Sequence, residues 1–254
     1  GELKYKSSSY LLSSIVKTRT KKSNIENFLY DNFWTNKKLN QKQLQKLNNF
    51  YWLFSLDLKS SNESVQMVIK NWIEKNYKYN TKNWNFEITS KRIISWLSNT
   101  SLTYDDGGKQ YQKDFNLIIH KQTSHLINQI DIEKRLNDKI RGTAAIILVG
   151  LSYKNDKLFT TKGLEYLKKI IRYNFDNNGF LKSRNIKSSI FFLKYLILIR
   201  EWFKESQSEI PEFIDESIFN LGQSYAFFWE NLKFDPLFNG NNISNNQEFD
   251  IYLK

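Results

Sequence analysis

Apolar residues recur at three- and four-residue steps through nearly the whole chain, and this periodicity constrains the fold more than any other feature. The pattern is typical of amphipathic helices that bury one face against their neighbours. It runs through residues 44–58, 65–73, 115–126, 140–151, 164–171, 190–203 and 213–229. The alternating pattern of β-strands is nearly absent. The sequence therefore predicts an all-α protein.

Polar turn segments separate the periodic ones, as at Asp105-Asp106-Gly107-Gly108 and Asp176-Asn177-Asn178-Gly179. The chain has no strict internal period, which disfavours a tetratricopeptide or ankyrin solenoid. We expect an incomplete α/α toroid, similar to an α/α barrel, in which inner helices line a cleft and outer helices surround them. Residues 1–240 are expected to form this single domain. The Asn-rich residues 241–254 are expected to begin a linker toward a further domain.

Composition limits the classes of partner without naming one. The 254 residues are 40% hydrophobic and 16% aromatic, which argues for a folded chain. A net charge of +12 favours a polyanion, whether nucleic acid, anionic lipid or acidic polysaccharide. The basic residues are dispersed apart from those at 17–22, and no zinc-finger, RNP or basic-zipper pattern is present. We therefore do not predict nucleic acid as the binding partner. The absence of cysteine excludes disulfides and thiolate metal sites.

No apolar run approaches the roughly 18 residues of a transmembrane helix, and the first residues do not form a convincing signal peptide. The residues themselves leave the compartment open.

The segment WNFEITSKRIISW at 84–96 is the richest in chemistry. Thr89-Ser90 is predicted to cap a helix, because a hydroxyl can accept an unpaired backbone N–H there. Arg92 and Trp96 would then share one helix face. A guanidinium beside an indole suits a sugar ring that carries a carboxylate. The same spacing fits a core tryptophan with an arginine lying along it, and the segment alone favours this second interpretation.

Three stretches, taken in order, resemble the heparinase II/III-like family, particularly its divergent bacterial members. The first, TSKRIISWLSN at 89–99, is followed by SHLINQI at 124–130. The second is FDNNGFLKSRNIKSSIFFLKYLILIREWF at 175–203, and the third is FFWENLKFDPLFNGNN at 227–242. The resemblance implies an α/α toroid normally followed by a C-terminal β-sandwich, and we expect that β-sandwich to be missing from these 254 residues.

The resemblance also implies a polysaccharide lyase that cleaves uronic-acid-containing polysaccharide, such as a glycosaminoglycan, by β-elimination without a cofactor. It suggests the bacterial cell envelope or periplasm. Lyases of the family carry an Asn-His pair where this chain has Arg141-Gly142-Thr143, and a Tyr-His pair where it has Ile186-Lys187. Binding of acidic polysaccharide is therefore predicted more firmly than its cleavage.

Arg92, Trp96, Arg184 and Asn185 are the predicted substrate-binding residues. The last two lie on a Gly-containing turn before a long helix, where they could clamp a carboxylate or sulfate beside free N–H groups. They could equally form a turn in which the asparagine takes an unusual φ and the arginine faces solvent.

Tyr153 is a candidate proton donor and His125 a candidate base, although a buried structural role suits both. His120 and His125 are five residues apart and would point about 140° from each other on a helix, so no paired metal site is expected. Two alternative functions stay open. One is a non-catalytic glycan-binding or scaffold domain, and the other is a basic domain that binds nucleic acid or an anionic surface.

Overall fold

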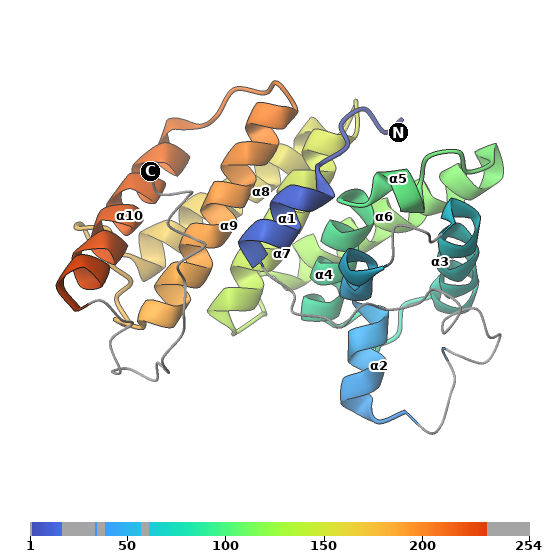
Figure 1. The fold of residues 1–254 in the computed structure, drawn as a ribbon, viewed down its shortest axis with the longest axis horizontal. Helices are drawn as coiled ribbons and strands as arrows, with labels where there is room; N and C mark the ends of the chain where they lie inside the picture. The colour runs from blue at the N-terminus through green and yellow to red at the C-terminus, as the bar shows by residue number, and fades with distance from the viewer. Residues whose placement is uncertain (1, 17–33, 35–38, 57–60, 233–254) are drawn as a thin grey trace.

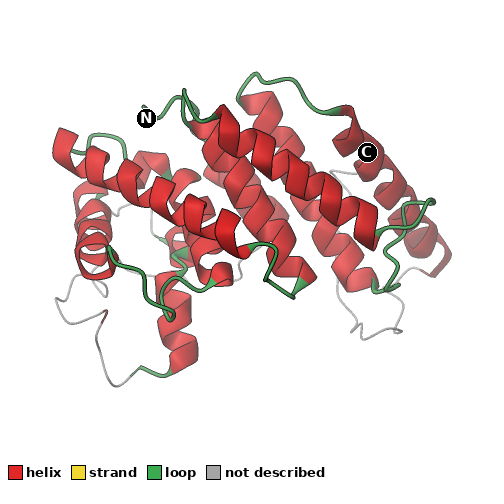
Figure 2. Cartoon of the chain, turned by 180° about the vertical axis from the view of Figure 1, so that it is seen from behind, coloured by secondary structure: helices red, strands yellow, loops and turns green. Residues whose placement is uncertain are grey.

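The computed structural model describes residues 2–16, 34, 39–56 and 61–232, and they form an all-α fold (Figures 1 and 2). Within these ranges the structure has no β-strand, and isolated β-bridges join Leu3 with Tyr153 and Phe175 with Leu181. The predicted fold class is confirmed. In chain order the helices are α1 (Ser9–Val16), α2 (Gln41–Asn48), the 3-10 helix η3 (Tyr51–Ser55), α3 (Asn62–Asn76), α4 (Phe86–Leu97), α5 (Thr100–Thr103), α6 (Lys109–Gln129), α7 (Leu136–Ser152), α8 (Lys157–Asn174), α9 (Ile186–Glu205) and α10 (Glu212–Leu232).

Helices α4, α7 and α9 form an inner layer and run in the same direction. The chain returns through α6 between α4 and α7, and through α8 between α7 and α9, and α10 follows α9; these three helices pack on the outside (Figure 1). In Figure 1, α7 and α9 begin low in the picture and end near its upper edge, and α4 rises in the same direction over a shorter span between α2 and α5. This layering of parallel inner helices with returning outer helices is that of an open α/α toroid.

Asparagine side chains cap two of the inner helices. The Oδ1 of Asn85 accepts the N–H of Glu87 at 3.1 Å and begins α4. The Oδ1 of Asn185 accepts the N–H of Ser188 at 2.9 Å and begins α9. Asparagine is as good an N-cap as serine, because its short side chain reaches the same unpaired N–H groups.

The predicted cap at Thr89-Ser90 is wrong. Both residues lie inside α4, where the hydroxyl of Ser90 donates to the carbonyl of Phe86 at 2.7 Å. A serine or threonine hydroxyl inside a helix can donate a hydrogen bond to the carbonyl four residues earlier. The presence of these residue types therefore does not by itself locate the start of a helix.

Two glycines let α7 and α8 approach closely. A Cβ added at Gly150 would lie 2.3 Å from the backbone N of Thr160, and one added at Gly163 would lie 2.4 Å from Cγ1 of Ile147. Real Cβ atoms do not come so near, so both positions need hydrogen in place of a side chain. The closeness places α8 as an outer helix directly against the central inner helix.

The N-terminal segment before α1 ties together the ends of the three inner helices. The hydroxyl of Ser7 lies 2.9 Å from that of Ser98 after α4. The N–H of Tyr5 donates to the carbonyl of Ser152, the last residue of α7, at 3.1 Å. The phenol of Tyr5 donates to Glu205, the last residue of α9. We call residues 2–8 the strap.

No helix among the residues described is long and apolar enough to cross a membrane. Residues 241–254, expected to begin a linker, lie outside the described ranges.

Candidate functional site

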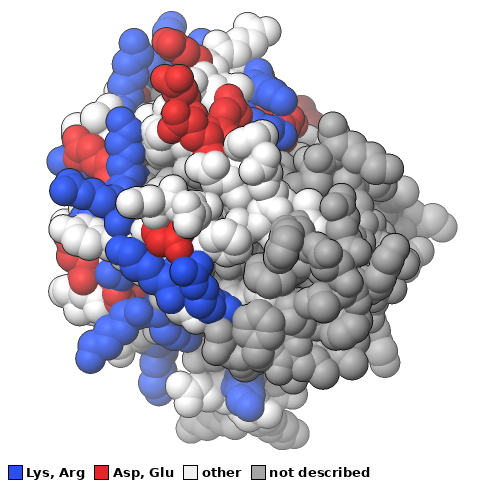
Figure 3. Space-filling model, turned by 90° about the vertical axis from the view of Figure 1, so that its left-hand side faces the viewer, with Lys and Arg blue, Asp and Glu red and all other residues white. Residues whose placement is uncertain are grey.

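The end of the bundle where α4, α7 and α9 begin concentrates groups that attract anions. The first turn of a helix leaves N–H groups without helical partners and carries the positive end of the helix dipole. Three such turns open at the same edge of the molecule (Figure 1). In a view of the α10 side, Lys and Arg predominate along the lower left, whereas the largest group of Asp and Glu lies near the upper edge (Figure 3). We call this lower edge the helix-start end.

Arg141 lies at the centre of the helix-start end, in the second turn of α7. Its Nη1 is 2.5 Å from Oδ1 of Asp138, and its Nε donates to the hydroxyl of Tyr195 on α9 at 3.2 Å. Its guanidinium lies 5.2 Å from the ring centroid of Phe191. Burial opposes its charge, but Tyr195, Tyr51 and Asp138 outweigh burial and raise the pKa of Arg141. The side chain is therefore a fixed cation, only 8% exposed.

Acidic groups balance this cation and connect α4 to α7. Glu87, in the first turn of α4, lies 2.5 Å from Nζ of Lys91 and 3.8 Å from Nη1 of Arg141. Burial favours its neutral form, but Lys91 and Arg141 outweigh burial and lower the pKa of Glu87. Burial raises the pKa of Asp138 despite the opposing effect of Arg141. The cluster is thus an alternation of charges rather than a bare cationic patch.

Tyr51 of η3 completes the cluster. Burial, the largest effect, together with Tyr195 raises its pKa well above the ordinary value. The phenol therefore keeps its proton at neutral pH and can act as a hydrogen-bond or proton donor.

A polar cavity of about 430 Å³ adjoins the cluster, between the loop before α4 and the loop before α7. Its lining includes Tyr79, Trp84, His125, Glu133, Lys134 and Arg135. Arg135 joins the cavity to the cluster, because its Nε lies 2.6 Å from Oδ2 of Asp138. We call this space the His125 cavity.

The structure places Arg92 and Trp96 in the core, with no exposed surface. The guanidinium of Arg92 donates to the side chains of Gln122 and Thr89 and to two backbone carbonyls. It also lies 4.0 Å from the ring centroid of Trp72. Burial lowers its pKa. Neither Arg92 nor Trp96 offers a ligand any surface to contact in this structure, and the tryptophan ring that Arg92 lies against is that of Trp72 rather than Trp96.

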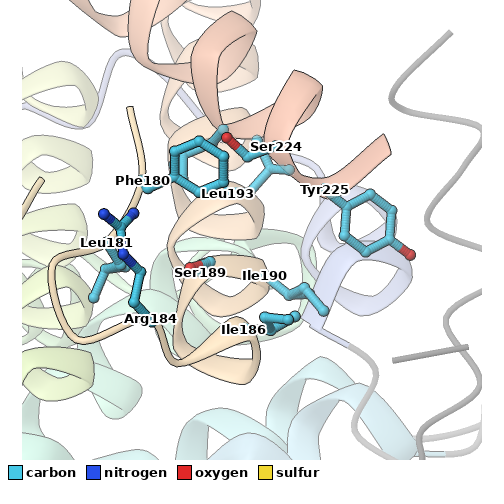
Figure 4. Close-up of a pocket in the computed structure, with 10 residues that line it drawn as sticks. Phe180, Leu181, Arg184, Ile186, Ser189, Ile190, Leu193, Ser224 and Tyr225 are labelled. Carbon is cyan, nitrogen blue, oxygen red and sulfur yellow. The ribbon is translucent and has the colours of Figure 1, made fainter. Parts of the chain in front are cut away.

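Arg184 and Asn185 do lie at the helix-start end, before α9. Arg184 has the unusual φ of 55° that we expected at Asn185, and its Nη2 pairs with Oδ2 of Asp176 at 2.8 Å. Its side chain is 53% exposed and lies at one side of an apolar cavity of about 390 Å³ between the turn, α9 and α10 (Figure 4). Asn185 is occupied as the cap of α9.

Tyr153 lies at the opposite end of α7 from Arg141. Tyr153 follows Arg141 by twelve positions, which along a helix corresponds to about 18 Å. Tyr153 is 2% exposed, and its hydroxyl donates to Oδ1 of Asn116 at 2.9 Å. It is therefore not part of the helix-start end.

The two histidines lie at different ends of the bundle. His120 lies beside Tyr153, with ring centroids 4.6 Å apart, whereas His125 lines the cavity at the helix-start end. Among the described residues no group of three or more His, Cys, Asp or Glu could hold a metal.

No protein-family model matches the sequence, and no curated protein matches it either. Among solved structures, the fold resembles that of heparan sulfate lyase HepC from Pedobacter heparinus, with a TM-score of 0.59 and 13% sequence identity. The two proteins share a fold. The similarity covers 77% of this chain and 33% of the lyase, so the chain spans about a third of that protein. The predicted family resemblance is thus supported as a distant relationship to a polysaccharide-lyase fold.

Sequence reasoning missed most of the cluster at the helix-start end. Arg141 was noticed only as a replacement for the family's Asn-His pair, and Asp138, Tyr51 and Tyr195 were not singled out. The Asp138-x-x-Arg141 spacing was a usable signal, because residues three apart on a helix are neighbours. The sequence offers no such signal for Tyr51 or Tyr195, because they lie on other helices, η3 and α9, far from Asp138 and Arg141 in the chain.

Proposed function

We propose that this toroid domain binds acidic polysaccharide at the helix-start end. The observation that carries the proposal is the gathering of Arg135, Arg141 and Lys91 with tyrosines where three parallel helices begin. The fold shared with a heparan sulfate lyase supports it. Sulfate and carboxylate groups on a polymer are the anions that suit such an end, because guanidinium groups and helix N-termini bind them through directed N–H groups.

The existing ion pairs define how a polymer would bind. Arg135 is 59% exposed while it contacts Asp138 and Glu133, so an incoming anion would share or replace those partners. Only the arginine of these pairs is exposed, because the side chains of Asp138 and Glu133 are 6% and 14% exposed, so an anion shares Arg135 with them more easily than it displaces them. Binding should therefore be reversible and weaken with salt.

Cleavage by β-elimination is the second candidate function. The reaction removes the proton alpha to a carboxylate and expels the 4-linked sugar, so it needs a neutralising cation, a base and an acid. The specific observation in its favour is Tyr51, a protonated phenol close to the cation of Arg141. In this assignment Arg141 neutralises the carboxylate and Tyr51, whose buried hydroxyl must first be uncovered, protonates the leaving oxygen. His125 is the candidate base.

Calorimetric titration with heparan sulfate, polygalacturonate and neutral dextran tests binding. We expect at least one acidic polymer to bind with affinity that falls as salt rises, and dextran not to bind. Failure of every acidic polymer to bind at low salt would contradict the proposal.

Cleavage is tested in the same mixtures by the absorbance of the unsaturated uronic acid ends that β-elimination produces. The Tyr51→Phe variant should abolish any activity found. An active Tyr51→Phe variant would remove Tyr51 from the assignment.

A further inference from the structure

We propose that the His125 cavity holds one sugar ring of the acidic polysaccharide. Tyr79 would stack on the ring, His125 would accept a hydrogen bond from a hydroxyl, and Lys134 would contact the acidic group. The inference rests on the proposed function and adds to it the place and chemistry of one subsite. The cavity volume of about 430 Å³ lies within the range of ligand sites, about 300–1,000 Å³.

Tyr79 is an aromatic side chain held in place yet largely exposed. Its ring centroid lies 5.2 Å from that of His125 and 6.2 Å from that of Trp84, while 57% of the residue is exposed. An aromatic ring fixed in this way offers a flat apolar surface without much further loss of side-chain freedom. The apolar face of a sugar ring is the complementary surface.

His125 lines the cavity, and one nitrogen of its ring can accept a hydrogen bond. Its Nε2 lies 2.9 Å from the carbonyl oxygen of Trp84, and because a carbonyl only accepts, Nε2 carries the proton. Burial lowers the pKa of His125, with the charge of Arg92 acting in the same direction, so the ring is neutral near pH 7. Nδ1 is then an acceptor, and no residue in the described ranges donates to it. Sugar hydroxyls are suitable donors.

Lys134 is a cation in the cavity lining whose charge is not paired with an acidic side chain among the described residues. Arg135 is already engaged by Asp138 at 2.6 Å and Glu133 at 3.6 Å. Lys134 is exposed and forms no ion pair with any described residue. A compact ammonium on a flexible stem can follow the carboxylate or sulfate of a bound ring. Together the three side chains suit a monosaccharide unit that carries one acidic group.

Affinity measurements with heparan sulfate and polygalacturonate on four proteins test the subsite. Tyr79→Ala should weaken binding about three- to tenfold, whereas Tyr79→Phe, which keeps the ring, should stay within about twofold of the parent chain. Phe219→Ala is the matched control, because Phe219 is an aromatic of similar exposure, 61%, on the outer helix α10. Circular dichroism checks that each variant is folded.

The outcomes separate the subsite from the proposed function. If the parent chain binds and Tyr79→Ala binds as tightly as Phe219→Ala, the subsite is overturned and polysaccharide binding stands. If the parent chain binds neither polymer, the subsite and the proposed function are both overturned.

The role of Lys134 is tested separately. The Lys134→Gln variant should bind with an affinity that depends less on salt, since one charge contact is lost. An unchanged salt dependence would remove Lys134 from the subsite.

Discussion

Arg92 illustrates what residue-level reasoning can and cannot determine. The sequence correctly predicts that it shares a helix with Trp96, and the spacing suits either a ligand site or a core. Arg92 is a core residue because its guanidinium donates to the side chain of Gln122 on α6 and to the backbone carbonyls of Asn48 and Asn83. The spacing of residues around Arg92 in the sequence does not predict these contacts. A buried guanidinium without a carboxylate is held by neutral acceptors and by the Trp72 ring.

Arg92→Met should therefore destabilise the fold rather than change ligand binding alone. The substitution keeps an apolar stem but leaves buried acceptors without donors, each costing about 1–3 kcal/mol. Urea unfolding should show a loss of at least that size. The control is Arg172→Met, at an exposed position on α8, which should change stability by less than about 0.5 kcal/mol. Equal stability of the two variants would contradict the structural role of Arg92.

His125 should make stability depend on pH in the weakly acidic range. Burial and Arg92 lower its pKa in the folded chain, so the unfolded chain takes up a proton first as the pH falls. Its contribution is complete above the ordinary pKa of about 6.5 and is lost as the pH drops below that value. We expect the urea midpoint to fall between about pH 7.5 and 5.5, and to fall less in His125→Gln. An identical fall in both proteins would assign the effect elsewhere.

At the scale of elements, periodicity located most helices and failed where tertiary packing intervened. The periodic segments at 140–151, 164–171 and 190–203 lie within α7, α8 and α9. Segment 44–58 was expected to be one helix, but α2 ends at Asn48 and Phe50 takes a left-handed φ of 58°. Its fully buried ring packs against Trp72 and Trp96, and these long-range contacts outweigh local helix preference.

The contact between α7 and α8 should depend on Gly150. Gly150→Ala would place a Cβ against the backbone of Thr160, which cannot rotate away, so the helices must separate. Overpacking of this kind costs about 1–3 kcal/mol. Thermal unfolding of Gly150→Ala beside Gly108→Ala measures the difference, because a Cβ at Gly108 meets nothing within 4 Å. A Gly150→Ala protein as stable as the Gly108→Ala protein would show that the two helices do not approach as described.

The strap should stabilise the ends of the inner helices. Tyr5→Phe removes the hydroxyl that donates to Glu205 and keeps the packed ring. A hydrogen bond to a charged group contributes about 1.5–3 kcal/mol, and the partial exposure of this one places it toward the lower figure. Hydrogen exchange should therefore quicken at the last turn of α9 and leave the first turn unchanged. Faster exchange at both ends would indicate a global effect instead of a local one.

At the scale of the whole molecule, the direction of the inner helices determines where charge gathers. Helical periodicity predicts many helices but not which of them run parallel, so the helix-start end could not be assembled from the sequence. Parallel inner helices bring the first turns of α4, α7 and α9 to one edge, together with Arg135, Arg141 and Arg184. The side opposite is held by the strap and carries Tyr153.

Hydrogen–deuterium exchange with and without a bound acidic polysaccharide tests the central claim most directly. The first-turn amides of a helix lack helical partners and exchange readily, so a ligand that contacts them slows their exchange. We predict protection in the first turns of α4, α7 and α9 and in the loops that precede α4 and α7, with the strap and Tyr153 unchanged. Protection confined to the strap end or to the outer faces of α8 and α10 would contradict binding at the helix-start end.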